Sequence, residues 1–142
     1  MNITQIATWL TFATIPAFLL LDVAYRARRF ETPRYWRVRG FLVTLCIFGL
    51  SFVVPMFWAR IIGDRTLLQL SSLGTWAGAA VGVLTYELCH YWYHRAVHKS
   101  DFLFRWVHQM HHSVEGIDAF GAFYLSPLDA IGFGSIGSLV FF

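Results

Sequence analysis

Three long stretches without charged residues constrain the fold more than any other feature of the chain. They cover residues 1–21, 40–59 and 66–86, and each matches the length of about 20 mainly apolar residues that a helix needs to cross a bilayer. Only 13% of all residues are charged, against about 25% in soluble domains. Helices buried in a soluble core could also lack charge, but they average only about 11–12 residues. The sequence therefore predicts an all-α, polytopic membrane helical bundle with spans at about residues 3–23, 41–58 and 67–86.

The first uncharged stretch could instead be a secretory signal peptide, which starts with basic residues and ends at a cleavage site of small residues. No basic residue precedes the apolar run here, and Asp22, Tyr25 and Arg26 follow it. We therefore expect a retained helix.

Arginine residues are distributed unevenly between the predicted loops. Six lie between Tyr25 and Gly40, whereas the next connection holds only Arg60 and Arg65. Because basic residues in short loops stay in the cytoplasm, we expect the first loop there and the N-terminus outside. The third span then leaves the membrane on the cytoplasmic side, and any active site built from the histidines that follow lies on that side. The same arginines account for the net charge of +3, which is therefore no indication of nucleic-acid binding.

The chain becomes apolar again after Ser126-Pro127. Asp129 is followed by 13 uncharged residues, which are too few to cross about 30 Å of hydrocarbon. We interpret residues 129–142 as the start of a fourth span, and residues 1–142 as one membrane domain of a longer natural protein.

All six histidines fall within 23 positions, and five of them show helical spacing. These are His94 and His98, four positions apart, and His108, His111 and His112, at positions i, i+3 and i+4. Residues three or four apart share a helix face, so two packed helices would direct five imidazoles at one volume. Neutral imidazole is a good ligand for iron, zinc and copper, and five exceed what one tetrahedral zinc ion needs. The pattern predicts two metal ions, although a single histidine at a membrane surface is usually only a polar side chain.

Two further residues precede this set on the same predicted helix. His90 lies four positions before His94 and could be a ligand or could hydrogen-bond a neighbour; both interpretations remain open. Glu87 lies seven positions before His94, at a depth where an ionisable group is costly and usually functional. It could donate an oxygen to a metal, but we favour a role as hydrogen-bonding partner of a metal-bound imidazole.

In the segment that holds these histidines, the sequence resembles the sterol desaturase / fatty acid hydroxylase superfamily. The likeness covers about residues 87–129 and rests on two histidine boxes, HxxxH at His94–His98 and HxxHH at His108–His112, with the aromatic residues before the first box and Arg95 within it. The resemblance implies a membrane-embedded helical bundle with a cytoplasm-facing site for two iron ions. It also implies oxygen-dependent hydroxylation or desaturation of a lipid such as a sterol or fatty acyl chain, in lipid biosynthesis.

The resemblance further implies which cofactors and partners to expect. His94 and His98 match the iron ligands of the first box, and His108, His111 and His112 match those of the second. Zinc could replace iron in recombinant samples, because it binds such sites more tightly than ferrous iron. Electrons would come from an external donor, cytochrome b5-like or a ferredoxin, since the chain has no haem, flavin or nicotinamide motif.

The chain departs from the family pattern at several positions. The third histidine box of the family is absent because the chain ends before it, so we expect residues 1–142 alone to be inactive. His90 occupies a position that is usually aromatic, and Tyr124 and Ser126 stand where the family has arginine and histidine. Asp118 stands where asparagine is common and is a further candidate for a place beside the metal.

Other classes of protein also place histidines at a membrane. A bis-histidine haem protein would need pairs facing each other across the bundle, and a zinc hydrolase would show an HExxH motif, which is absent. A non-catalytic metal- or haem-binding membrane protein is the main alternative. The sequence leaves open the lipid substrate and the choice between hydroxylation and desaturation.

Overall fold

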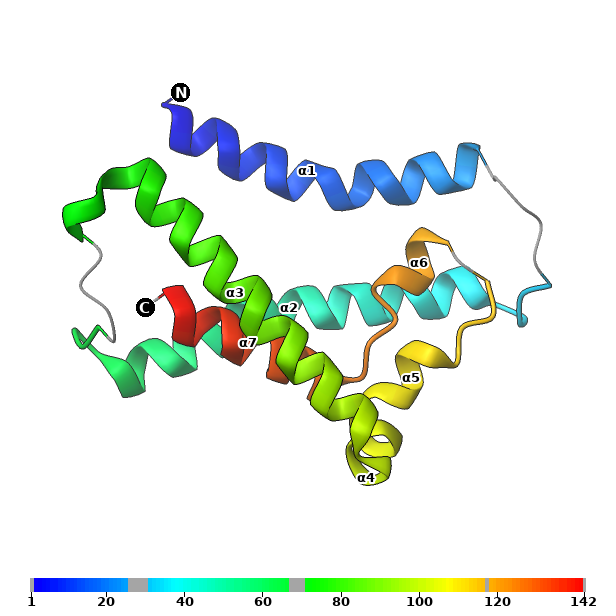
Figure 1. The fold of residues 1–142 in the computed structure, drawn as a ribbon. Helices are drawn as coiled ribbons and strands as arrows, with labels where there is room; N and C mark the ends of the chain where they lie inside the picture. Colours follow the sequence, from blue (N-terminus) through cyan, green and yellow to red (C-terminus); the bar gives the residue numbers. More distant parts are fainter. Residues whose placement is uncertain (1, 26–30, 67–70, 117, 142) are drawn as a thin grey trace.

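The structure is a computed structural model that describes residues 2–25, 31–66, 71–116 and 118–141. All regular structure within these residues is helical, which confirms the all-α prediction (Figure 1). The long helices are α1 (Ile3–Ala24), α2 (Trp36–Ile62), α3 (Gly74–Lys99) and α7 (Pro127–Phe141). Short turns connect them: η1 (Ser71–Leu73), α4 (Asp101–Leu103), the π-helical turn η2 (Phe104–His108), α5 (Gln109–His112) and α6 (Ala119–Ala122).

Helix α7 folds back after the histidine segment and packs against both α2 and α3 (Figure 1). Its small residues allow the close approach to α2: a Cβ atom at Gly134 would lie only 3.2 Å from Cγ1 of Val54. Trp58 of α2 also donates a hydrogen bond through Nε1 to Ser135 Oγ, at 2.9 Å. The interface between α2 and α7 is therefore the main packing contact of the long helices.

The start of α2 lies beside the loop that follows the histidine segment. Trp36 Nε1 donates to Asp118 Oδ2 at 2.7 Å, and Gly40 leaves space for Phe120 of α6, since a Cβ there would lie 2.7 Å from Phe120 Cβ. Helix α1 contacts α2 through Phe12, whose ring lies 5.6 Å from that of Phe48. The histidine segment and the N-terminal end of α2 thus lie at the same end of the molecule.

One helix among the described residues, α2, is long and apolar enough to cross a membrane, and it contains the predicted span at residues 41–58. Only 17% of its most apolar part is buried, unlike the core helix of a soluble protein. The apolar part of α1 (Thr8–Ala24) and α7 are shorter, and α3 does not meet the same criterion. Residues 67–70 of the predicted third span, and residue 142, lie outside the described residues. The multi-pass topology stays a prediction.

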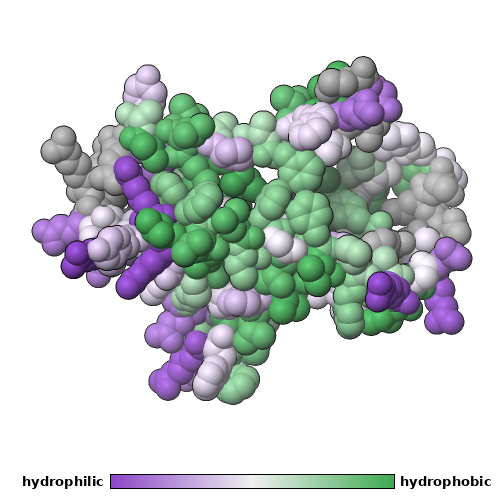
Figure 2. All heavy atoms as spheres, turned by 180° about the vertical axis from the view of Figure 1, so that it is seen from behind, coloured by the Kyte–Doolittle hydropathy of each residue, from purple (hydrophilic) through white to green (hydrophobic). Residues whose placement is uncertain are grey.

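Large apolar side chains cover much of the surface. Trp9, Leu20, Trp76 and Leu84 are each at least 65% exposed. Figure 2 shows a broad apolar surface across the middle of the molecule, with hydrophilic side chains gathered towards its periphery. Such a surface suits contact with lipid or with further apolar segments.

Candidate metal centre

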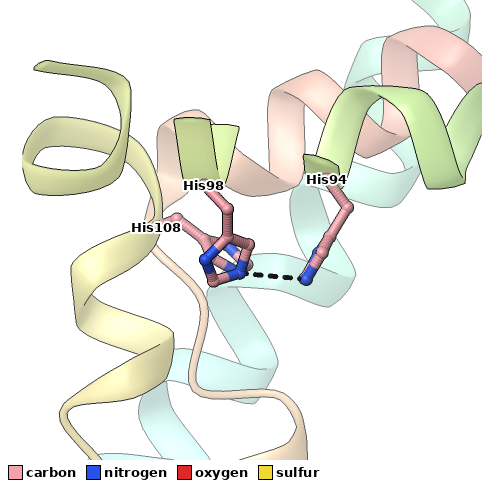
Figure 3. A group of neighbouring side chains, drawn as sticks. All are labelled: His94, His98 and His108. Carbon is pink, nitrogen blue, oxygen red and sulfur yellow. Dashed lines mark hydrogen bonds between the residues drawn. The ribbon is translucent and has the colours of Figure 1, made fainter. Parts of the chain in front are cut away.

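The C-terminal turns of α3 carry the first two histidines of the cluster. The helix continues without interruption from Gly74 to Lys99, so His94 and His98 lie one turn apart on one face. Their Nε2 atoms approach to 3.1 Å (Figure 3). The sequence prediction that these two imidazoles share a face is confirmed.

The second group of histidines comes from the turn η2 and from α5. In η2 the N–H of Gln109 bonds to the carbonyl oxygen of Phe104, five residues earlier, which widens the helix by one residue. His108 ends this turn, and its ring lies 4.6 Å from that of His94 (Figure 3). One turn later, His112 brings its Nε2 to 3.2 Å from His98 Nε2. Turns of this kind occur frequently at functional sites.

The separations between the ring nitrogens fit a metal ion. Two nitrogens bound to one ion at about 2.1 Å, with bond angles of about 90–110°, lie about 3.0–3.4 Å apart. The Nε2 pairs of His94 with His98 and of His98 with His112 fall within this range. Ligand atoms of His94, His98 and His108 all lie within 4.8 Å of one another. The histidine cluster could therefore hold a metal ion.

Two buried ring nitrogens of the cluster have no partner among the described residues. They are His108 Nε2 and His111 Nδ1. A buried polar atom without a hydrogen bond is costly, and a metal ion would satisfy it. The ring of His111 lies 5.3 Å from that of His108. These observations place His111 beside the group formed by His94, His98 and His108.

The surroundings keep these imidazoles in the form that binds metals. Burial, followed by the effect of the neighbouring His108, lowers the pKa of His94, His111 and His112 below the ordinary histidine value of 6.5. The three rings are then neutral at neutral pH, and a neutral ring has a lone pair to donate.

A buried carboxylate beside the cluster was not among the predicted site residues. Asp129 of α7 has no exposed surface, and its Oδ2 lies 2.6 Å from His108 Nδ1. Its other oxygen, Oδ1, accepts a hydrogen bond of 3.3 Å from Tyr93 OH. Burial, and then the charge of Asp129, raises the pKa of Tyr93 to about 12, so this hydroxyl keeps its proton. The sequence did hold one indication of Asp129, because it is an acidic residue at the edge of an uncharged stretch. The same feature had singled out Glu87.

Three of the predicted residues lie apart from the histidine cluster. His90 contacts the ring of Phe133 at 4.5 Å, and its ring is 6.5 Å from that of His94. Glu87 is exposed, and within the described part of the chain no hydrogen bond joins it to a histidine. Asp118 caps α6 by accepting from Gly121 N and bonds Trp36, so both its oxygens have structural partners. Roles for these three residues at the metal stay predictions.

Comparison with known proteins agrees with this arrangement. Residues 79–142 match the family model named fatty acid hydroxylase, and the matched segment contains all six histidines and Asp129. This part of the chain is therefore similar to the fatty acid hydroxylase family. Members of the family are lipid-modifying oxidative enzymes. The resemblance to this superfamily, stated from the histidine boxes, is confirmed.

Curated relatives agree with the fatty acid hydroxylase assignment. Two proteins, from Oryza sativa subsp. indica and Oryza sativa subsp. japonica, carry the name very-long-chain aldehyde decarbonylase GL1-9. Each is 32% identical to this chain over 62 residues, which are 44% of this chain and 24% of the relative. The match thus spans about a quarter of the length of these relatives. No solved structure matches the chain.

Proposed function

We propose that the complete protein is an oxygen-dependent membrane oxidoreductase that holds two iron ions and hydroxylates or desaturates a lipid. The observation that carries the proposal is the convergence of His94, His98 and His112 through Nε2 atoms separated by 3.1 and 3.2 Å. These residues lie in the segment that matches the fatty acid hydroxylase family model. A sterol or a fatty acyl chain is the substrate class that we expect.

Five histidines of this chain would hold the iron: His94, His98, His108, His111 and His112. Iron bound there would supply the oxygen activation and electron transfer that an unactivated C–H bond requires and that amino-acid side chains lack. His108 is buried at the base of the cluster, whereas His98 and His112 are exposed. The exposed side leaves room for the substrate and for oxygen. Electrons would come from an external donor, cytochrome b5-like or a ferredoxin.

The proposed protein is multi-pass, with the histidines on the cytoplasmic side. A cavity of about 350 Å³ is lined both by residues 31–33 and Trp36, before and at the start of α2, and by residues 113–116, after the last histidine. This proximity supports a common side of the membrane for the arginine-rich loop and the metal site. The assignment of that side to the cytoplasm rests on the excess of arginine in the loop.

Lipid mass spectrometry of cells with and without the full-length gene tests the proposal. Because two Oryza sativa relatives are named for very-long-chain aldehydes, the lipids measured should include these together with sterols and fatty acids. We expect an oxidised lipid that depends on the gene and is lost in His98→Ala, while membrane insertion of the variant is unchanged. Lys99→Ala, which alters the exposed neighbour of His98, is the matched control and should keep the activity.

Three outcomes would contradict the proposal. Full activity in His98→Ala would exclude the ligand role. A purified protein that binds metal but changes no lipid would favour the non-catalytic alternative, and a Soret absorption band would indicate haem in place of iron bound by histidines alone.

A further inference from the structure

The pair formed by His108 and Asp129 is the most buried polar contact among the described residues. The side chains are 1% and 0% exposed, and the two atoms that join them, Nδ1 and Oδ2, are 2.6 Å apart. A buried carboxylate is tolerated only when hydrogen-bond donors surround it. Asp129 finds two, the ring of His108 and the hydroxyl of Tyr93.

Asp129 lies in the first turn of its helix. Asp129 is the third residue of α7, and its backbone N–H donates to Ser126 Oγ at 3.1 Å. The N-terminal turn of a helix stabilises negative charge. A metal-bound histidine usually donates its other ring N–H to a carboxylate, and Asp129 Oδ2 lies 2.6 Å from Nδ1 of His108. The second ring nitrogen of His108, Nε2, is buried and has no partner in the described residues, so it is the atom left to bind a metal.

The same turn of α7 also holds the backbone next to His108. Ser126 Oγ donates a hydrogen bond to the carbonyl oxygen of Val107, within the π-helical turn η2. The first turn of α7 therefore fixes both the ring of His108 and the chain that carries it.

We propose that Asp129 is a positioning residue that fixes His108 as an Nε2 ligand of the metal centre, with Tyr93 holding the second carboxylate oxygen. The inference rests on the proposed function only in assuming that the cluster binds metal. It adds the ligating atom of His108, and it makes α7 a part of the site although α7 contributes no ligand.

Metal affinity of the full-length protein tests this role. The protein is purified without metal and titrated with Co²⁺ in competition with a chelator. We expect Asp129→Asn to bind Co²⁺ about 10–100-fold more weakly, as is usual when the partner of a metal-bound imidazole is changed. Asp64→Asn makes the same change at an exposed carboxylate beyond the end of α2, and it should bind like the wild type. In a His108→Ala background, Asp129→Asn should cause no further loss, because Asp129 acts through His108.

A measurement on the wild type tests the proposal even if the Asp129→Asn variant does not fold. Nitrogen-15 NMR of the metal-free, histidine-labelled protein above pH 7.5 reports which ring nitrogen carries hydrogen, with His108 assigned by its absence in His108→Gln. The proposal predicts hydrogen on Nδ1. Hydrogen on Nε2, or a Co²⁺ affinity unchanged by Asp129→Asn, would overturn it. If the wild type itself bound no Co²⁺, the proposed function would fail instead, whatever the tautomer of His108.

Discussion

Burial differs among the five imidazoles from one side of the cluster to the other. His108 is fully buried, His94 and His111 are half-buried, and His98 and His112 are exposed. The buried ring is held by a hydrogen bond to Asp129, whereas the exposed rings of His98 and His112 pack against each other and against His108. The exposed side of the cluster is accessible to a substrate.

The lowered histidine pKa values predict a pH dependence of stability for the metal-free protein. The pKa values of His94, His111 and His112 lie below the ordinary value of 6.5 in the folded state. As the pH falls through about 6.5, the unfolded chain takes up protons before the folded one does, so the free energy of unfolding decreases. We expect the thermal unfolding midpoint of the metal-free full-length protein to drop between about pH 7.5 and pH 5.5. The drop should be smaller in His94→Gln, and an equal drop in both proteins would contradict the assignment.

Sequence spacing predicted the five imidazoles as ligands because residues three or four apart on a helix share a face. It did not identify Asp129, which lies in a different helix and reaches His108 only because α7 folds back between α2 and α3. For the same reason it did not predict that Trp36, 82 positions earlier, donates a hydrogen bond to Asp118. Contacts between distant segments depend on helix packing, which the spacing of histidines does not encode.

At the scale of the elements, the histidine segment is less regular than the spacing predicts. A continuous α-helix over His108–His112 was the simplest expectation, but η2 adds a residue to the turn that ends at His108. The all-helical class and the helix over the second span were predictable, because long apolar runs have few alternatives. The π-helical turn was not, because the carbonyl of Val107 is held from outside the segment by Ser126.

The close contact between α3 and α7 predicts that Gly132 does not tolerate substitution by a larger residue. A Cβ atom at Gly132 would lie 2.1 Å from the hydroxyl oxygen of Tyr93, so Gly132→Ala must displace the ring that bonds Asp129. Overpacking of this kind costs about 1–3 kcal/mol, and we expect a lower thermal unfolding midpoint together with weaker metal binding. Gly49→Ala is the matched control, because nothing lies within 4 Å of its added Cβ. That variant should gain about 0.5–1 kcal/mol from the lower entropy of alanine. Equal stability of the two variants would contradict the close packing of α3 on α7.

At the scale of the whole molecule, the exposed apolar surface agrees with a membrane setting. Helix α2 has 27 residues, or about 40 Å at 1.5 Å per residue, and hydrocarbon is about 30 Å thick. Its start lies at the histidine end of the molecule, and its other end lies far from it (Figure 1). A single crossing by α2 would thus put Asp64 on the side opposite to the metal site.

Cysteine labelling tests this topology in the full-length protein. In a background with Cys46→Ala and Cys89→Ala, single cysteines are introduced as Arg34→Cys, Asp64→Cys and Lys99→Cys. We expect an impermeant maleimide added to intact cells to label only the cysteine at position 64. The cysteines at positions 34 and 99 should react only after permeabilisation, because the proposed topology puts both on the cytoplasmic side. Labelling of positions 34 and 99 from opposite sides would exclude the proposed arrangement.

An anomalous difference map of the iron-loaded full-length protein is the most direct test of whether these histidines bind metal. Data recorded at the iron absorption edge should give peaks within about 2.2 Å of the Nε2 atoms of His94, His98 and His112. A centre of two iron ions should give two such peaks in the cluster, one of them bound by His108 Nε2. A map without a peak within bonding distance of any of these atoms would contradict the proposed metal centre.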